Sequence, residues 1–93
     1  MNKYEFTVIF DTDEEKTKLG LEFVTGRFEK FKAEVTKQED LGVKTLAYQI
    51  NKNDKGHYVY FELNADPETI NKMSHDFLLN GNILKFLFIN PEN

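Results

Sequence analysis

The segment from Leu41 to Leu63 constrains the fold more than any other, because it contains two stretches in which the side chains on one face are mostly apolar. Alternation with a period of two residues is the pattern of a β-strand that buries one face. The positions on the apolar faces are Leu46, Tyr48 and Ile50, then His57, Val59, Phe61 and Leu63. Between them, residues 53–56 hold three turn formers, and we expect Gly56 to adopt a positive φ. The segment therefore predicts a long antiparallel hairpin.

Residues 4–10 predict an earlier strand, because every even position from Tyr4 to Phe10 is apolar. The polar residues that follow end this strand. Thr12 and Glu15 have the spacing of a capping box, so they predict the start of a helix.

That helix is expected to run from about residue 13 to residue 32. The apolar stripe that could cover a sheet consists of Leu21, Val24, Phe28 and Phe31. Leu19 and Phe23 fall on the opposite side of the helix, where the periodicity assigns them no partner.

A strand beginning at Glu34 leads into the hairpin, and we expect a bulge at residues 39–42, where Gly42 relaxes the backbone. After the hairpin, Asp66 and Pro67 form a helix start, with the aspartate as cap and the proline at the first position. The apolar stripe of this second helix is Ile70, Met73 and Phe77. Residues 80–82 end it, and residues 83–89 predict a final strand.

The element order β-α-β-β-α-β predicts an α+β fold of the ferredoxin-like type, in one domain of residues 1–93. One four-stranded antiparallel sheet would carry both helices on one face. The residues expected to face the helices are Phe6, Val8, Leu46, Tyr48, Ile50, Val59, Phe61, Leu63, Phe86 and Phe88. Those expected to face away are Glu5, Thr7, Ala47, Tyr58, Tyr60, Leu87 and Ile89.

The charge balance argues against a domain that holds nucleic acid alone, because 12 basic and 16 acidic residues give a net charge of −4. The hairpin differs from this average: residues 41–60 carry Lys44, Lys52 and Lys55 against Asp54. Any RNA contact is therefore expected near the hairpin. The chain has no cysteine, and no apolar run approaches the length that spans a bilayer, so we expect a soluble protein without a membrane partner.

No motif for catalysis, a metal or a small-molecule substrate is present. The acidic residues 11–15 lack the spacing of a calcium loop and suit a helix N-terminus better. His57 and His75 have no nucleophile or carboxylate pattern beside them, and no glycine-rich phosphate loop follows a strand. We therefore predict that the chain is not an enzyme and needs no cofactor.

Tyr58 and Tyr60 are expected on the uncovered side of the sheet beside Leu87 and Ile89. Exposed apolar groups of this kind favour a docking surface for a partner. Residues 55–61 also resemble the RNP signature of RNA-recognition motifs, one residue short, in which such rings stack on unpaired bases. A third interpretation is that these tyrosines are ordinary strand formers without a function.

The hairpin resembles the signature of the bacterial small-subunit (30S) ribosomal protein S6 family. The resemblance is carried by residues 42–51, Gly-Val-Lys-Thr-Leu-Ala-Tyr-Gln-Ile-Asn, and then by Lys52, Gly56 and Tyr58. Length and element order also fit that family over the whole chain. Two positions depart from the usual pattern. Thr45 stands where the family tends to carry a charged or amide side chain, and Gln49 stands where proline is common.

The resemblance implies a structural protein of the cytoplasmic ribosome. Such a protein binds central-domain ribosomal RNA together with ribosomal protein S18. Carried onto this chain, it places RNA contacts at Lys3, Lys44 and Lys52 and protein docking at Tyr58, Tyr60, Leu87 and Ile89. The alternative is an RNA-recognition-type module that binds single strands through Tyr58 and Tyr60. The acidic net charge and the lack of aromatic residues facing outward on the first strand argue against it.

Overall fold

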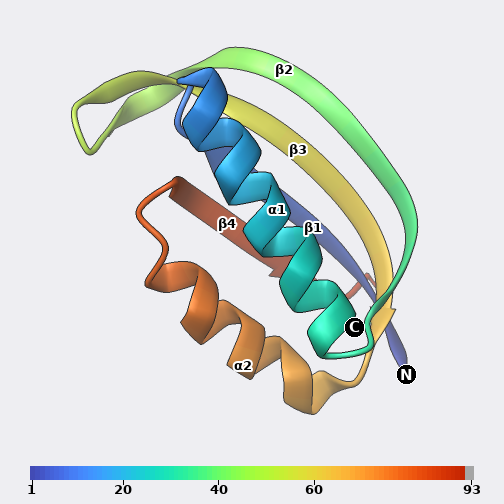
Figure 1. Ribbon diagram of the computed structural model, residues 1–93. Helices are drawn as coiled ribbons and strands as arrows, with labels where there is room; N and C mark the ends of the chain where they lie inside the picture. The colour runs from blue at the N-terminus through green and yellow to red at the C-terminus, as the bar shows by residue number, and fades with distance from the viewer. Residues whose placement is uncertain (92–93) are drawn as a thin grey trace.

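The computed structural model describes residues 1–91 and contains six regular elements (Figure 1). In chain order they are β1 (Asn2–Phe10), α1 (Glu14–Lys30), β2 (Glu34–Ile50), β3 (Asn53–Ala65), α2 (Pro67–Leu78) and β4 (Ile83–Ile89). This is the predicted β-α-β-β-α-β order.

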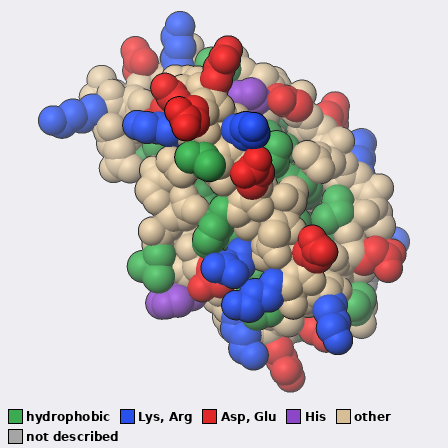
Figure 2. Space-filling model, in the orientation of Figure 1, with side chains coloured by type: hydrophobic (Ala, Val, Ile, Leu, Met, Phe, Trp, Pro, Cys, Tyr) green, Lys and Arg blue, Asp and Glu red, His purple; other side chains and the backbone are tan. Residues whose placement is uncertain are grey.

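The four strands form one antiparallel sheet in the order β2-β3-β1-β4, and both helices lie on the same side of it (Figure 1). The ferredoxin-like prediction is therefore confirmed. On the helix side, acidic and basic side chains lie intermixed with scattered hydrophobic ones (Figure 2). We call the opposite side of the sheet, which neither helix covers, the outer face.

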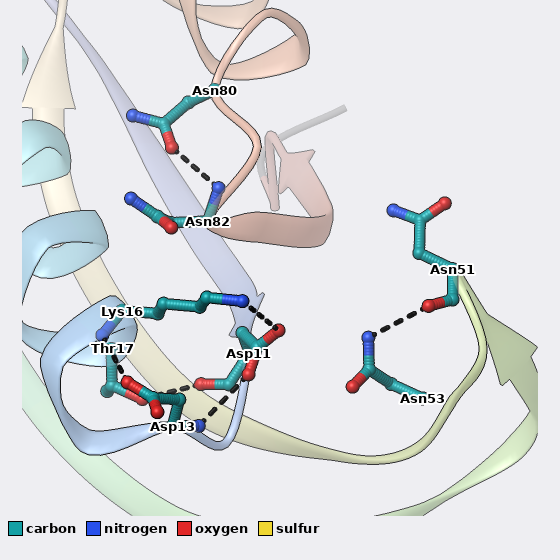
Figure 3. A network of polar contacts seen from close by, with 8 residues as sticks. All are labelled: Asp11, Asp13, Lys16, Thr17, Asn51, Asn53, Asn80 and Asn82. Atoms are coloured by element: carbon teal, nitrogen blue, oxygen red, sulfur yellow. Dashed lines mark hydrogen bonds and ion pairs between the residues drawn. The ribbon is translucent and has the colours of Figure 1, made fainter.

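The start of α1 differs from the predicted capping box. Asp13 is the N-cap residue, and its carboxylate accepts a hydrogen bond from the Lys16 backbone N–H at 3.1 Å. Asp11 supports this turn, because its side chain accepts from the Asp13 N–H and its carbonyl accepts from the Thr17 hydroxyl (Figure 3). Aspartate at this position satisfies a backbone donor that has no partner within the helix.

The start of α2 lies where Asp66 and Pro67 predict it, but the Asp66 side chain makes no capping hydrogen bond. Instead its backbone carbonyl accepts from both the N–H and the hydroxyl of Thr69, at 2.9 and 2.7 Å.

The core lies between the sheet and the two helices, and the ring of Phe6 is at its centre. This ring packs edge-on against Phe28 of α1 at a centroid distance of 5.5 Å and tilted against Phe77 of α2 at 5.4 Å. It also contacts Phe88 of β4 at 4.4 Å. The largest fully buried side chains are Phe6, Phe10, Phe28, Phe61, Phe77, Leu63, Met73, Val8, Val24 and Val59. The predicted core positions of both helices and of β1 and β3 are therefore confirmed.

Phe23 and Leu19, for which the periodicity gave no partner, have different environments. Phe23 faces α2, where it packs edge-on against Phe77 at 6.2 Å, and the Arg27 guanidinium lies 4.7 Å from its ring centroid. Arg27 Nε also lies 3.2 Å from a carboxylate oxygen of Asp76, although out of line for a hydrogen bond. Leu19 remains exposed. A single-helix wheel could not show the contact of Phe23 because it comes from the second helix.

The predicted bulge in β2 is present, but its consequence was not predicted. The pairing with β3 shifts between Asp40 and Gly42, where Gly42 has φ +82° and donates its N–H to the Asp40 carboxylate at 2.8 Å. The extra residue, Leu41, reverses the alternation of β2 beyond this point. The prediction that Leu46, Tyr48 and Ile50 face the helices is therefore wrong, because all three line a small hollow on the outer face.

The hairpin turn also lies elsewhere than predicted. Asn51 and Lys52, both with positive φ (50° and 65°), connect the paired residues Ile50 and Asn53. Two central residues with positive φ are the mark of a type I′ turn, whose twist matches that of the strands. Gly56 lies inside β3 without a positive φ; it is needed because a Cβ there would overlap Cγ2 of Ile9.

The core assignment can be tested by truncating one ring on each helix. We expect Phe28→Ala and Phe77→Ala each to lower the free energy of unfolding by about 3–5 kcal/mol, because the lost transfer energy and the new cavity add. Leu78→Ala is the control, because this side chain is 75% exposed at the end of α2. Urea denaturation of the three variants gives the values. Equal losses in all three would contradict the core described here.

Candidate nucleic-acid and protein interface

The outer face presents its side chains in rows that cross β3, β1 and β4. By strand register the three rows are Glu62, Glu5 and Ile89; Tyr60, Thr7 and Leu87; and Tyr58, Ile9 and Lys85. Along each strand these positions alternate with buried or partly buried core residues such as Phe6, Val8 and Phe86. The predicted outward orientation of Tyr58, Tyr60, Leu87 and Ile89 is therefore confirmed.

The exposure within this face is uneven. Leu87 and Ile89, on the edge strand β4, are 55% and 46% exposed. Tyr58 and Tyr60 are only half-buried, because neighbouring strands flank both rings. The apolar surface that a partner could reach thus lies mostly on β4.

The end of the face around Tyr60 contains two facing carboxylates. Glu5 and Glu62 stand directly opposite each other on neighbouring strands, and the Tyr60 hydroxyl donates a hydrogen bond to Glu62 Oε2 at 2.9 Å. Burial of the hydroxyl, its hydrogen bond to Glu62 and the charges of both carboxylates raise the pKa of Tyr60 to about 12. Two like charges directly opposite each other on neighbouring strands lower the stability of the sheet. Lys37 of β2 stands opposite Glu62, and Lys3 precedes Glu5 on the same face, so this end carries both signs of charge, with the two facing carboxylates beside Tyr60.

The other end of the face is basic. The Lys44 ammonium lies 5.7 Å from the ring centroid of Tyr58, and the Lys85 ammonium lies 5.4 Å from that of Tyr48. Lys85 Nζ also donates a hydrogen bond to the Tyr48 hydroxyl at 2.9 Å, which raises the pKa of Lys85. Because Tyr48 belongs to β2 and Lys85 to β4, the two edge strands of the sheet, the end of the hairpin crosses the outer face. We call residues 46–54 the hairpin arm.

The lysines predicted to contact RNA do not form one cluster. Lys44 pairs with Gly56, and Lys52 lies in the nearby turn, so these two share the arm end of the sheet. Lys3 pairs with Asn64, eight residues away along β3, which corresponds to about 26 Å. Lys3 could therefore reach only a separate stretch of RNA.

Sequence reasoning missed Lys85 and Tyr48 as members of this face. The alternation of Lys85 with Phe86 was a sufficient signal that its side chain points outward. Tyr48 gave no such signal, because it alternates in step with Leu46 and Ile50, and apolar positions of a strand are expected to face the helices.

A further polar contact lies beside the bulge in β2. His57 Nε2 lies 2.7 Å from a carboxylate oxygen of Asp40, and the hydrogen bonds from the Gly42 N–H and from His57 lower the pKa of Asp40. Within residues 1–91 no three His, Cys, Asp or Glu side chains gather as metal ligands. None of the helices described there has the length and apolar character needed to span a membrane.

Comparison with known proteins adds evidence from outside the chain. The family model described as "Ribosomal protein S6" matches residues 3–90. A small ribosomal subunit protein bS6 of Treponema denticola is 31% identical over 93 residues and is covered completely, as is this chain. The bS6 protein of Acidiphilium cryptum is 41% identical over 70 residues, which are 75% of this chain but 44% of that longer relative.

The fold has a similar solved counterpart. The crystal structure of 30S ribosomal protein S6 from Thermotoga maritima superposes with a TM-score of 0.88 at 21% identity, over 98% of this chain and 88% of that one. At this identity the likeness concerns the fold alone.

The unusual environment of Tyr60 can be measured by alkaline titration. We expect one tyrosine to ionise near pH 12, well above the ordinary value of 10.0. Since the folded-state pKa is raised, the stabilisation is present below pH 10 and is lost as the pH rises towards 12. Ultraviolet absorbance follows the ionisation, and urea unfolding at each pH follows the stability.

Tyr60→Phe should remove the late ionisation step and flatten the loss of stability across this range, whereas Tyr58→Phe should retain both. A wild-type chain whose four tyrosines all ionise together near pH 10 would contradict the environment described for Tyr60.

Proposed function

Because this chain belongs to the ribosomal protein S6 family, whose members are structural proteins of the small ribosomal subunit, we propose that it binds central-domain ribosomal RNA together with ribosomal protein S18 in the cytoplasm. As a member of this family the chain is a structural constituent of the small subunit and not an enzyme. The RNA and protein contacts below are the proposal.

The observation that carries the proposal is the uncovered outer face, with two facing carboxylates near one end and lysines at the other. Leu87 and Ile89 expose apolar surface beside Tyr60, and Glu5 and Glu62 lie in the adjoining positions. Apolar surface next to these two carboxylates suits a basic protein better than an acidic one. We therefore assign the docking of S18 to Tyr58, Tyr60, Leu87 and Ile89.

RNA is assigned to the arm end of the sheet, with contacts from Lys44 and Lys52 and a separate contact from Lys3. Each lysine supplies a charge for a phosphate, which positions the protein and does not specify bases. With a net charge of −4, few phosphates can be neutralised by this chain alone. The basic partner must provide the remaining attraction.

The alternative of base stacking on Tyr58 and Tyr60 is less well supported. The Tyr60 hydroxyl is held by Glu62, and Glu5 adds a second negative charge close to this ring. A nucleotide stacked there would bring its phosphate towards two carboxylates. A partner protein with cationic side chains meets no such repulsion.

Titration of central-domain RNA tests the joint binding. We expect the isolated chain to bind weakly at physiological salt, and a ternary complex to form when S18 is added. Lys44→Glu should weaken that complex and reduce the slope of log K against log salt by about one, because a phosphate contact is lost. Gel-shift titrations at several salt concentrations measure both quantities.

Lys55→Glu is the matched control, because it makes the same charge change on an exposed lysine of the neighbouring strand β3. Its partner Thr45 places it on the helix side, away from Lys44. Tight, salt-resistant binding of the isolated chain to an unpaired oligonucleotide would overturn the proposal and support the stacking module.

The docking surface is tested by the double variant Leu87→Ser with Ile89→Ser. We expect it to keep its melting temperature, since both side chains are exposed, and to lose at least tenfold in affinity for S18. The double variant Leu78→Ser with Leu79→Ser is the control, because these leucines are 75% and 74% exposed at the end of α2. Isothermal calorimetry compares the two; equal affinities would place the docking surface elsewhere.

A further inference from the structure

The hairpin arm holds a lysine from the far edge of the sheet. Lys85 of β4 donates its hydrogen bond to the Tyr48 hydroxyl at 2.9 Å, and its ammonium lies over the ring of the same tyrosine. The Tyr48 side chain is nevertheless 61% exposed. The ring is therefore accessible to a ligand while its hydroxyl fixes the position of a positive charge.

A second lysine lies beside the same arm. Lys44 lies over the ring of Tyr58, and Tyr58 and Lys85 both line the hollow between the arm and the sheet. In the strand order Tyr58 of β3 lies between Lys44 of β2 and Lys85 of β4. Hydroxyls and ring faces orient a lysine without neutralising its charge, so both charges stay available.

Among the described residues, neither lysine forms an ion pair that would compensate its charge. In the part of the chain that the structure describes, neither Lys44 nor Lys85 has a carboxylate within ion-pair distance. The hollow between the arm and the sheet is lined by Ile9, Leu46, Ala47, Tyr48, Ile50, Tyr58 and Lys85, none of which is acidic. Two lysines around one tyrosine therefore favour an anion in this place.

We propose that Lys44, Lys85 and Tyr48 form a binding site for a backbone phosphate of single-stranded RNA, with the adjoining base on the exposed ring of Tyr48. The two ammonium groups bind the phosphate from the two sides of Tyr58. Tyr48 acts as the positioning residue, because its hydroxyl holds Lys85 towards the arm. The site rests on the proposed RNA-binding function. It adds Lys85 of β4 and Tyr48 of β2 to the residues assigned to RNA.

The chemistry of the site selects the phosphodiester over the other outer-face ligands. A cationic protein segment is repelled by the two lysines and attracted to Glu5 and Glu62 at the opposite end. A base alone gains stacking on Tyr48 but leaves both lysines without an anion. In a single-stranded nucleotide, the base can stack on the ring of Tyr48 while the phosphate binds the two lysines.

Titration of the isolated chain with a uridine trinucleotide, followed by two-dimensional NMR, tests the site. We expect the largest shift changes at Tyr48, Tyr58 and Lys85, with weak affinity. Lys85→Gln should raise Kd about tenfold, and Tyr48→Phe, which keeps the ring and loses the hydroxyl, about threefold. The slope of log Kd against log salt should fall by about one in Lys85→Gln.

Lys55→Gln is the matched control, because it removes the same charge from an exposed lysine on the helix side. Uridine without phosphate is the ligand control and should give no saturable shift. Equal Kd values for Lys85→Gln and Lys55→Gln, or equal binding of uridine and the trinucleotide, would overturn the site. S18 takes no part in this titration, so failure of the ternary complex and failure of this site are separate results.

Discussion

Phe6 joins the sheet to both helices, and the rest of the structure depends on the core around it. Its ring contacts Phe28 of α1, Phe77 of α2 and Phe88 of β4 within 5.5 Å between centroids. Because both helices bury their apolar stripes on this one side of the sheet, the opposite side remains without a cover. A sheet buried on one side only is stable here, since the aromatic core supplies the burial that a second layer would otherwise add.

The bulge at Gly42 decides what the uncovered side presents. One extra residue in β2 turns Leu46 and Tyr48 from the helix side to the outer face, and it requires the positive φ that glycine adopts without strain. The hairpin arm then packs over Ile9, where Gly56 leaves room for the close approach. The contact of Tyr48 with Lys85, between the two edge strands of the sheet, follows from this bulge together with the second shift in the pairing between Thr45 and Ile50.

The sequence was sufficient for the elements and for most of the core, because each period is strong within its own segment. Phe6 and Val8 of β1, like Met73 and Phe77 of α2, lie where their spacing predicts. It was insufficient beyond the bulge, because Leu46, Tyr48 and Ile50 were assigned to the helix side as the apolar positions of their segment, whereas these side chains line a hollow on the outer face. The turn was misplaced for a related reason. Residues 53–56 contain a glycine and the true turn has none, so composition favoured the wrong four residues.

The separation of charge on the outer face bears on how two ligands could bind at once. Under the proposed function, the basic protein occupies the end with Glu5 and Glu62 and the RNA occupies the end with Lys44 and Lys85. Apart from Lys3, which lies at the end with Glu5 and Glu62, the charges that attract one ligand lie away from those that attract the other. When both ligands also contact each other, binding of the first holds the second at a high effective concentration. A chain with a net charge of −4 can then contribute to RNA binding without a strong affinity of its own. Under the proposed function, the distribution of charge on the face therefore matters more for assembly than the total charge.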